Sequence, residues 1–234
     1  MNRPWTEHIF RALQPDYRDR SRFYDESLTS HITKDSVWID IGCGPNEHVM
    51  EFGHLAKLAL GIDILDDNSR TNATFIRADL RKLPFATSCA TLITLRMVAE
   101  HLERVPEDFS EINRILAPGG RLIVLTTNTR SPIIFLARIL PYSIKRWLIR
   151  KIFKVSNDEI FPTFHKFNTP GMMARGVLDM KLSSLRFIEG VPLERPWLTC
   201  IFGTWYCFTK IPLLWYFRSN LLAIFQRIEG NTTI

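Results

Sequence analysis

Short runs of apolar and β-branched residues recur along the first half of the chain, and acidic residues, glycine or proline follow most of them. Each run has the length of a buried strand. Between them lie stretches with apolar residues at helical spacing, at 47–57 and 107–116. Because strands that alternate with helices form a parallel sheet covered on both faces, the pattern predicts a doubly wound α/β fold. The predicted strands cover residues 36–41, 58–63, 74–79, 90–95 and 121–126.

The flanking segments have a different character. Residues 1–30 mix aromatic and charged side chains at helical spacing, and we expect them to form an N-terminal helical cover. Residues 131–169 interleave apolar and basic side chains, which is typical of a helical insertion over the carboxyl edge of the sheet. Two more strands are predicted at 185–190 and 220–226, with the Trp- and Phe-rich segment 197–217 between them.

Length and composition restrict the class of protein. The 234 residues suit a single α/β domain over 1–234 with an elaboration, and the 46% apolar and 23% charged fractions are those of a globular chain. The four cysteines form no C-x-x-C pair and lack a histidine at zinc spacing, so neither a metal site nor a disulfide framework is expected. Without an apolar leader at the N-terminus, we expect a cytoplasmic protein with reduced thiols.

The net charge of +6 is modest, but basic residues gather between Arg138 and Lys154, where no acidic residue occurs. The run is either a solvated helix face or an amphipathic helix for an anionic membrane surface, and residues 133–155 would make that contact. The same face could grip a sugar nucleotide or a nucleic acid. A membrane span over 197–217 is not expected, because Lys210 interrupts the apolar run.

Ligands of doubly wound sheets bind outside the carboxyl ends of the strands, so the residues after each apolar run are the candidate site. Glycine without a side chain lets a ligand lie against the backbone, and the following helix offers amide donors. The candidate cofactor-binding residues are Asp40, Gly42, Cys43, Gly44, Asp63, Ile64, Asp79, Leu80 and Leu95.

Charge discriminates between the cofactors that such a loop could hold. A dinucleotide loop of the G-x-G-x-x-G type would place its third glycine at Glu47, whose carboxylate would oppose a pyrophosphate. S-adenosylmethionine carries a sulfonium and an ammonium group, so Asp40 is a favourable neighbour for it. Asp63 can accept from both ribose hydroxyls, and Asp79 is placed to meet the adenine amino group. As a lone residue, Asp79 could instead be a helix cap.

Five segments in order resemble the class I S-adenosylmethionine-dependent methyltransferases, in particular their small-molecule branch. They are Val37-Trp-Ile-Asp-Ile-Gly-Cys-Gly-Pro, Gly61-Ile-Asp, Ala78-Asp-Leu-Arg-Lys-Leu-Pro-Phe, Met97-Val-Ala-Glu-His-Leu and Arg114-Ile-Leu-Ala-Pro-Gly-Gly-Arg-Leu. The resemblance implies a Rossmann-like, seven-stranded, mainly parallel sheet with an antiparallel last strand and a helical insertion after strand five. The chain departs from the family at Asn46, where a third glycine often stands, and at Ala90, where an aspartate commonly opens the fourth strand.

The segment from Asp158 to Pro170 resembles methyltransferases of bacterial polysaccharide and glycolipid pathways, which implies that His165, Asn168 and Thr169 lie near the acceptor. A hydroxyl acceptor benefits from a general base, and the candidates are His165 and His101. His101 follows Glu100 in what resembles a helix start, where a packed or capping histidine is the competing interpretation.

The sequence thus predicts methyl transfer from S-adenosylmethionine to a small molecule, with the hydroxyl of a saccharide or lipid-linked acceptor as the leading hypothesis. The alternatives are a nucleic-acid methyltransferase, which the absence of a Pro-Pro-aromatic motif after Leu95 disfavours, and a catalytically silent module that docks on a membrane or partner enzyme. A dinucleotide oxidoreductase is disfavoured by Glu47. The expected location is cytoplasmic, with peripheral attachment to the inner face of the membrane as an option.

Overall fold

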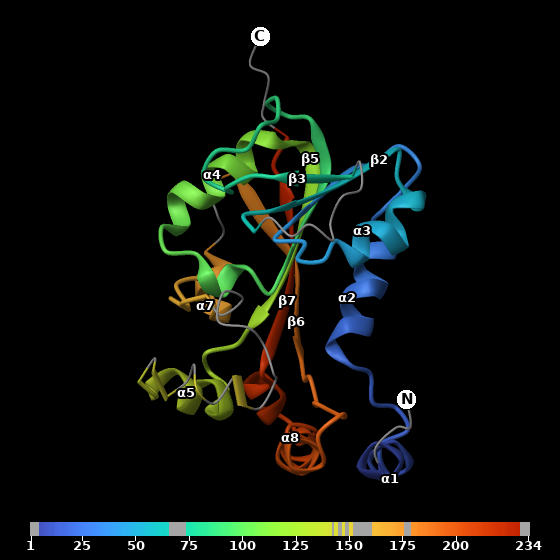
Figure 1. Cartoon of the computed structure of the whole chain (residues 1–234), viewed down its shortest axis with the longest axis vertical. Coiled ribbons are helices and arrows are strands. Elements are labelled where there is room, and N and C mark those ends of the chain that lie inside the picture. The colour runs from blue at the N-terminus through green and yellow to red at the C-terminus, as the bar shows by residue number, and fades with distance from the viewer. Residues whose placement is uncertain are drawn as a thin grey trace.

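A computed structural model describes residues 5–65, 74–141, 143–144, 147, 150–151, 161–175 and 179–229 (Figure 1). Seven strands form one sheet in the order β3-β2-β1-β4-β5-β7-β6. The strands β1 to β5 pair in parallel, while β7 runs antiparallel to both of its neighbours. The predicted Rossmann-like sheet with an antiparallel last strand is confirmed. The strands are β1 (Val37–Ile41), β2 (Leu58–Asp63), β3 (Phe75–Arg77), β4 (Ala90–Arg96), β5 (Leu116–Thr127), β6 (Met180–Ile188) and β7 (Asn220–Arg227).

Helices cover both faces of the sheet. Figure 1 shows α2 and α3 on one side and α4 and α7 on the other, while α1, α5 and α8 lie together at one end of the long axis. The α-helices are α1 (Trp5–Leu13), α2 (Arg20–Thr29), α3 (Glu47–Phe52), α4 (Val105–Ile115), α5 (Pro132–Ile139), α7 (Pro170–Ala174) and α8 (Pro196–Phe208). Short 3₁₀ turns are η1 (Gly53–Leu55), η3 (Ala99–His101) and η5 (Leu214–Phe217).

Alternation along the central strands divides the core into two apolar clusters. Ile39 and Ile93 belong to the cluster under α4, whereas their neighbours Trp38 and Leu92 belong to the cluster under α2 and α3. Successive strand residues point to opposite faces, so a strand with helices on both sides must be apolar throughout. This explains why the strands are readable as unbroken apolar runs.

Several segments differ in extent from the sequence prediction. The first predicted helix, 47–57, is α-helical only as far as Phe52 and then tightens into η1. The sixth strand begins at Met180 because β7 pairs with it over its whole length, which a local pattern does not reveal. Segment 197–217 forms α8 and η5. The predicted insertion 131–169 begins with α5, and its residues 152–160 lie outside the described part. The single-domain division over 1–234 stays a prediction.

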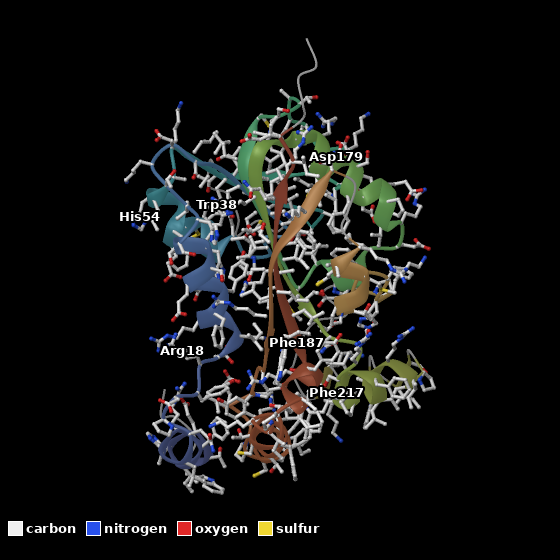
Figure 2. All side chains as sticks on the ribbon, turned by 180° about the vertical axis from the view of Figure 1, so that it is seen from behind. Arg18, Trp38, His54, Asp179, Phe187 and Phe217 are labelled. Atoms are coloured by element: carbon white, nitrogen blue, oxygen red, sulfur yellow. The ribbon has the colours of Figure 1, made fainter. Side chains whose placement is uncertain are left out.

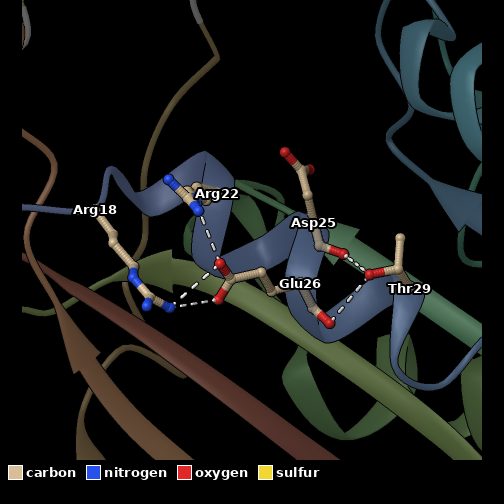
Figure 3. Close-up of polar contacts among 5 residues, drawn as sticks. All are labelled: Arg18, Arg22, Asp25, Glu26 and Thr29. Carbon is tan, nitrogen blue, oxygen red and sulfur yellow. Dashed lines mark hydrogen bonds and ion pairs between the residues drawn. The ribbon is translucent and has the colours of Figure 1, made fainter.

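Helix α2 shows an ordinary solvent-facing surface (Figure 3). The Arg18 Nη1 atom lies 3.3 and 3.2 Å from the two Glu26 carboxylate oxygens, and Arg22 Nε donates to Glu26 over 3.2 Å. Thr29 Oγ1 donates to the Asp25 carbonyl oxygen one turn earlier, over 2.8 Å. Charged side chains thus cover the face that turns away from the sheet, as an amphipathic helix requires.

A buried carboxyl joins the two ends of the long connection between β6 and β7. Glu189 follows β6 and accepts hydrogen bonds from the Ser219 backbone N–H, over 3.0 Å, and from the Ser219 hydroxyl. Burial raises the pKa of Glu189 to about 7, against an ordinary value of 4.5, although the bonds from Ser219 act in the opposite direction. The folded protein therefore binds this proton more tightly than the unfolded chain does.

This raised pKa predicts a pH-dependent stability. The contribution of protonated Glu189 is fully present below pH 4.5 and is lost as the pH rises through about 7. Glu189→Gln has a neutral group at every pH. Between pH 5 and pH 8 the free energy of unfolding of the wild type should therefore fall by about 1 to 3 kcal/mol relative to that of the variant. Urea unfolding of both proteins across this range measures the difference. Parallel stability curves would show that Glu189 titrates normally.

Candidate functional site

A cavity of about 440 Å³ opens at the carboxyl ends of β1 and β2. We group the lining residues by their place in the chain. The first wall comes from the ends of β1 and β2 and the residues after β3: Ile41, Gly42, Ile62, Asp63, Ile64, Ala78, Asp79, Leu80 and Arg81. The second wall comes from the residues after β4 together with two phenylalanines: Met97, Val98, His101, Leu102, Glu103, Arg104, Asp108, Phe161 and Phe164.

The glycine loop after β1 turns sharply through left-handed backbone conformations. Gly42 has φ +71° and Gly44 has φ +56°, values that glycine adopts without steric cost. The Gly42 N–H donates to the Ile62 carbonyl oxygen over 2.7 Å, which draws the loop toward β2. A Cβ atom at Gly42 would lie 2.2 Å from the Val98 Cγ2 atom. Glycine is therefore required at 42 by both conformation and space.

Asn46 takes the place of the third glycine by adopting the same kind of backbone. Its φ is +63°, in the left-handed region that asparagine tolerates better than most side chains. The side chain is fully buried, and its Nδ2 atom lies 3.3 Å from Thr74 Oγ1. A Cβ atom at Gly61 would come within 1.9 Å of the Asn46 Oδ1 atom, so Gly61 provides the room for this side chain.

Asp63, the last residue of β2, joins the loop to the cavity. One carboxylate oxygen accepts from the Gly44 N–H over 2.9 Å, and the other accepts from the Leu65 N–H over 2.9 Å. These two bonds fix the orientation of the carboxylate at the cavity wall. Position and orientation suit an acceptor for ligand hydroxyls.

Asp79 also lines the cavity, but its carboxylate is already engaged. One of its oxygens accepts from the Arg81 backbone N–H over 2.9 Å, and the Arg81 Nε atom lies 3.0 and 3.1 Å from the two oxygens. Hydrogen bonding from Arg81 lowers the pKa of Asp79. The carboxylate therefore stabilises a turn and an ion pair, and its predicted contact with adenine stays a prediction.

Asp40 lies below the cavity and does not line it. Its Oδ1 atom accepts from the Thr94 hydroxyl over 2.6 Å, and that hydroxyl in turn accepts from the Trp38 indole N–H over 2.9 Å. Burial raises the pKa of the Asp40 carboxyl. The residue thus connects β1 to β4 immediately beneath the glycine loop.

The structure brings part of the predicted site together. Among the predicted residues, the cavity is lined by Gly42, Asp63, Ile64, Asp79, Leu80 and His101. The cavity lining does not include Asp40, Cys43, Gly44, Leu95 or His165. Of these, Gly44 acts through its hydrogen bond to Asp63, and Cys43 and Leu95 are buried directly behind the wall.

His101, at the end of η3, has a defined tautomer. Its Nδ1 atom lies 2.8 Å from the Pro162 carbonyl oxygen, and a carbonyl oxygen can only accept, so Nδ1 carries the proton. The Nε2 atom of the neutral ring is then free of a proton and available as a base. Phe161 contacts the ring edge to face, with the centroids 5.9 Å apart.

His165 is buried instead, at 7% exposure. Its backbone has φ +54°, its N–H donates to the Glu100 carbonyl oxygen, and its Nδ1 atom lies 3.4 Å from Thr127 Oγ1. Nearby, Thr126 Oγ1 donates to Glu100 over 2.7 Å and accepts from Asn168 Nδ2 over 2.6 Å. These bonds hold the segment that carries His165 against η3 and β5.

Thr169 also has a structural partner, since its hydroxyl accepts from the Met172 N–H at the start of α7. The charged and aromatic lining residues that were not among the predicted site residues are Arg81, Glu103, Arg104, Asp108, Phe161 and Phe164. Arg81 could have been found from its spacing of two after Asp79, where an aspartate turn is common. Among the described residues, no cluster of three histidine, cysteine or acidic side chains could hold a metal ion.

The comparisons with known proteins agree with this geometry. A family model described as a methyltransferase domain matches residues 39–124, from β1 into β5. Ubiquinone/menaquinone biosynthesis C-methyltransferase UbiE of Azotobacter vinelandii is 29% identical over 102 residues, which is 37% of this chain and 40% of that protein. The Pseudomonas paraeruginosa protein of the same name is 33% identical over 84 residues, 35% of this chain and 33% of its own length. The chain spans two fifths or less of these relatives.

Solved structures share the whole sheet at low identity. An S-adenosylmethionine-dependent methyltransferase from Mesorhizobium loti has a TM-score of 0.59 at 18% identity, covering 86% of this chain and 96% of its own. Geranyl diphosphate C-methyltransferase from Streptomyces coelicolor, in complex with Mg²⁺, geranyl diphosphate and S-adenosyl-L-homocysteine, has a TM-score of 0.53 at 15% identity. It covers 88% of this chain and 77% of that one. These similarities show the fold.

Three observations converge on one family. The match over 39–124 includes the glycine loop and most of the cavity lining, and the strand order with an antiparallel β7 completes the fold. The cofactor that these features favour is S-adenosylmethionine. Residues 39–124 match a methyltransferase domain, and the chain has the fold of the class I S-adenosylmethionine-dependent methyltransferases.

Proposed function

We propose that this protein transfers a methyl group from S-adenosylmethionine to a small-molecule acceptor, namely a hydroxyl of a saccharide or lipid-linked substrate. One observation supports this most strongly. A single cavity has Gly42 and Asp63 on one wall and His101, with an unprotonated Nε2 atom, on the other. A cofactor bound at Gly42 and Asp63 would therefore share this cavity with an acceptor bound near His101.

The residues present fit the proposed cofactor. Gly42 offers bare backbone at the wall, and Asp63 offers a fixed carboxylate for ribose hydroxyls. Glu47 opens α3, so its carboxylate stands where a pyrophosphate would have to bind. The other wall adds the acidic side chain of Asp108. Carboxylates at these positions favour a cofactor that carries positive charge.

When bound, S-adenosylmethionine supplies an electrophilic methyl group on a positively charged sulfur. The chain's part is to position the acceptor and to accept its proton. His101 Nε2 would accept the proton that the acceptor hydroxyl loses, while bound S-adenosylmethionine would supply the methyl group that takes its place. The Pro162 carbonyl oxygen holds the Nδ1 proton and stabilises the imidazolium that forms.

The wall around His101 suggests the kind of acceptor. Leu102, Phe161 and Phe164 provide apolar and aromatic surface next to the imidazole. Such a surface binds the apolar face of a sugar ring or the first carbons of a lipid chain. The names of the UbiE relatives make a carbon acceptor the competing candidate, and a carbon acceptor would depend on the same wall. Peripheral attachment near residues 133–155, of which the structure describes only a part, belongs to this proposal.

Removal of the Asp63 carboxylate should weaken cofactor binding. Asp63→Ala eliminates the acceptor for the ribose hydroxyls and the bond to the Gly44 N–H. We expect isothermal titration with S-adenosylmethionine to show a loss of about 1 to 3 kcal/mol. Asp35→Ala, at an exposed position before β1, is the matched control and should bind as the wild type does. Binding of NADH by the wild type, or equal affinity of both variants, would contradict the cofactor site.

Substitution of His101 should reduce transfer without reducing cofactor affinity. With tritiated methyl donor and lipid and polysaccharide extracts of the source organism, His101→Ala should transfer the label roughly 10²-fold more slowly. His54→Ala, an exposed histidine on the flank of the molecule (Figure 2), serves as the control. If His165→Ala abolishes transfer and His101→Ala does not, the base has been assigned to the wrong histidine.

A further inference from the structure

One end of the molecule exposes apolar side chains in a way that the rest of the surface does not. Fifteen of the twenty exposed large apolar residues in the described part of the chain belong to α1, to α5 and the residues just after it, or to α8 and η5. We name this surface the apolar end. Its members are Trp5, Ile9, Leu13, Phe135, Leu136, Ile139, Leu140, Ile144, Trp147, Trp197, Ile201, Phe208, Ile211, Leu213 and Trp215.

These elements lie together in space. Figure 1 and the reverse view in Figure 2 both place α1, α5 and α8 at the same end of the long axis, and Figure 2 shows Asp179 near the opposite end. Helices α1 and α8 pack closely, since a Cβ atom at Gly203 would lie 2.9 Å from the Phe10 ring. The loop before α5 is joined to η5, because Asn128 Nδ2 donates to the Tyr216 and Arg218 carbonyl oxygens over 3.1 and 2.8 Å.

Helix α8 lacks the solvent-facing surface that α2 has. Its sequence, PWLTCIFGTWYCF, contains no charged residue, although Trp197, Ile201 and Phe208 are each more than half exposed. On α2, Arg22 and Glu26 cover the corresponding face, and Arg18 reaches Glu26 from just before the helix (Figure 3). Exposure of an apolar helix face to water is unfavourable because of the hydrophobic effect. The exposed face of α8 therefore suits contact with another apolar surface.

Basic residues outnumber acidic ones around the apolar end, where the acidic side chains are Glu7 in α1, which is paired with Arg11, Asp16 after α1 and Glu194 before α8. The sequence contains no acidic residue from Ile112 to Asn157 and none from Arg195 to Ile228, the two stretches that hold α5, α8 and η5. Arg138 and Lys210 are exposed there, and Lys151 lies over the Trp147 ring at 4.9 Å from its centroid. Apolar side chains, tryptophan and basic residues together are the composition of a surface that binds anionic membrane interfaces.

We propose that the apolar end docks on a lipid bilayer with anionic headgroups, as a peripheral contact of three separate elements. Within the described residues no helix has the length and hydropathy to cross a bilayer. A second copy of the chain is a poorer occupant, because a two-fold interface would bring Arg138 and Lys210 of both copies into one basic region. This docking extends the peripheral attachment of the proposed function from residues 133–155 to three elements, and it does not depend on the methyl transfer itself.

Vesicle flotation of the full chain tests the proposal. The wild type should float with vesicles of phosphatidylcholine and phosphatidylglycerol, bind pure phosphatidylcholine about tenfold more weakly or worse, and release as salt is raised. The emission of its exposed tryptophans should shift to the blue on binding. The double variant Trp197→Glu with Ile201→Glu should lose at least about tenfold in vesicle affinity. Arg138→Glu with Lys210→Glu should lose the preference for the anionic lipid.

The matched control is Met50→Glu with Leu58→Glu, which changes two exposed apolar residues outside the apolar end and should float as the wild type does. Thermal unfolding and titration with S-adenosylmethionine confirm that each variant is folded, and they separate failure of docking from failure of the cofactor site. No flotation of the wild type overturns the proposal. So does a dimer in light scattering that Trp197→Glu dissociates, since the occupant is then a second copy, and so does equal loss in the control variant.

Discussion

The site depends on one constraint in the backbone: within five residues after β1, three have a left-handed conformation. Gly42, Gly44 and Asn46 all have positive φ, and they fold the chain back so that the Gly44 N–H reaches Asp63. The Gly42 backbone then approaches Val98 too closely for any side chain. The same turn thus orients the Asp63 carboxylate and brings Val98 of the second wall against the loop. Pairing of β1 with β2 and β4 in the sheet holds these parts side by side.

Polar groups behind the cavity are arranged to keep that turn rigid. The Asp40 carboxylate accepts a hydrogen bond from the Thr94 hydroxyl, and the Glu100 carboxylate accepts one from the Thr126 hydroxyl. These two buried acids therefore connect neighbouring segments and do not line the cavity. Burial raises the pKa of both carboxyls, which favours their neutral, hydrogen-bonded forms over free charge. Among the described residues, the carboxylates in the first wall are those of Asp63 and Asp79.

The sequence allowed most of the fold to be predicted because the buried strands are continuous apolar runs and their ends carry glycine or aspartate. Asp63 and Gly42 could be located for the same reason. Contacts between distant segments could not be predicted: the Asp40 side chain turns to Thr94, 54 residues away, and His101 gains its tautomer from Pro162, 61 residues away. The exposure of α8 and η5 could not be predicted from the composition of segment 197–217, because an apolar helix has the same residue pattern in a core and on a surface.

The pairing of Asn46 with Gly61 has a consequence for how this sequence can change over time. While asparagine occupies position 46, a side chain at 61 would collide with its Oδ1 atom. A change of Asn46 to glycine would remove that obstacle but not the Cys43 Sγ atom, which would lie 2.9 Å from a Cβ atom at position 61. A side chain at position 61 therefore requires changes at two positions of the loop after β1, and a lineage that keeps either of them is confined to glycine on the neighbouring strand.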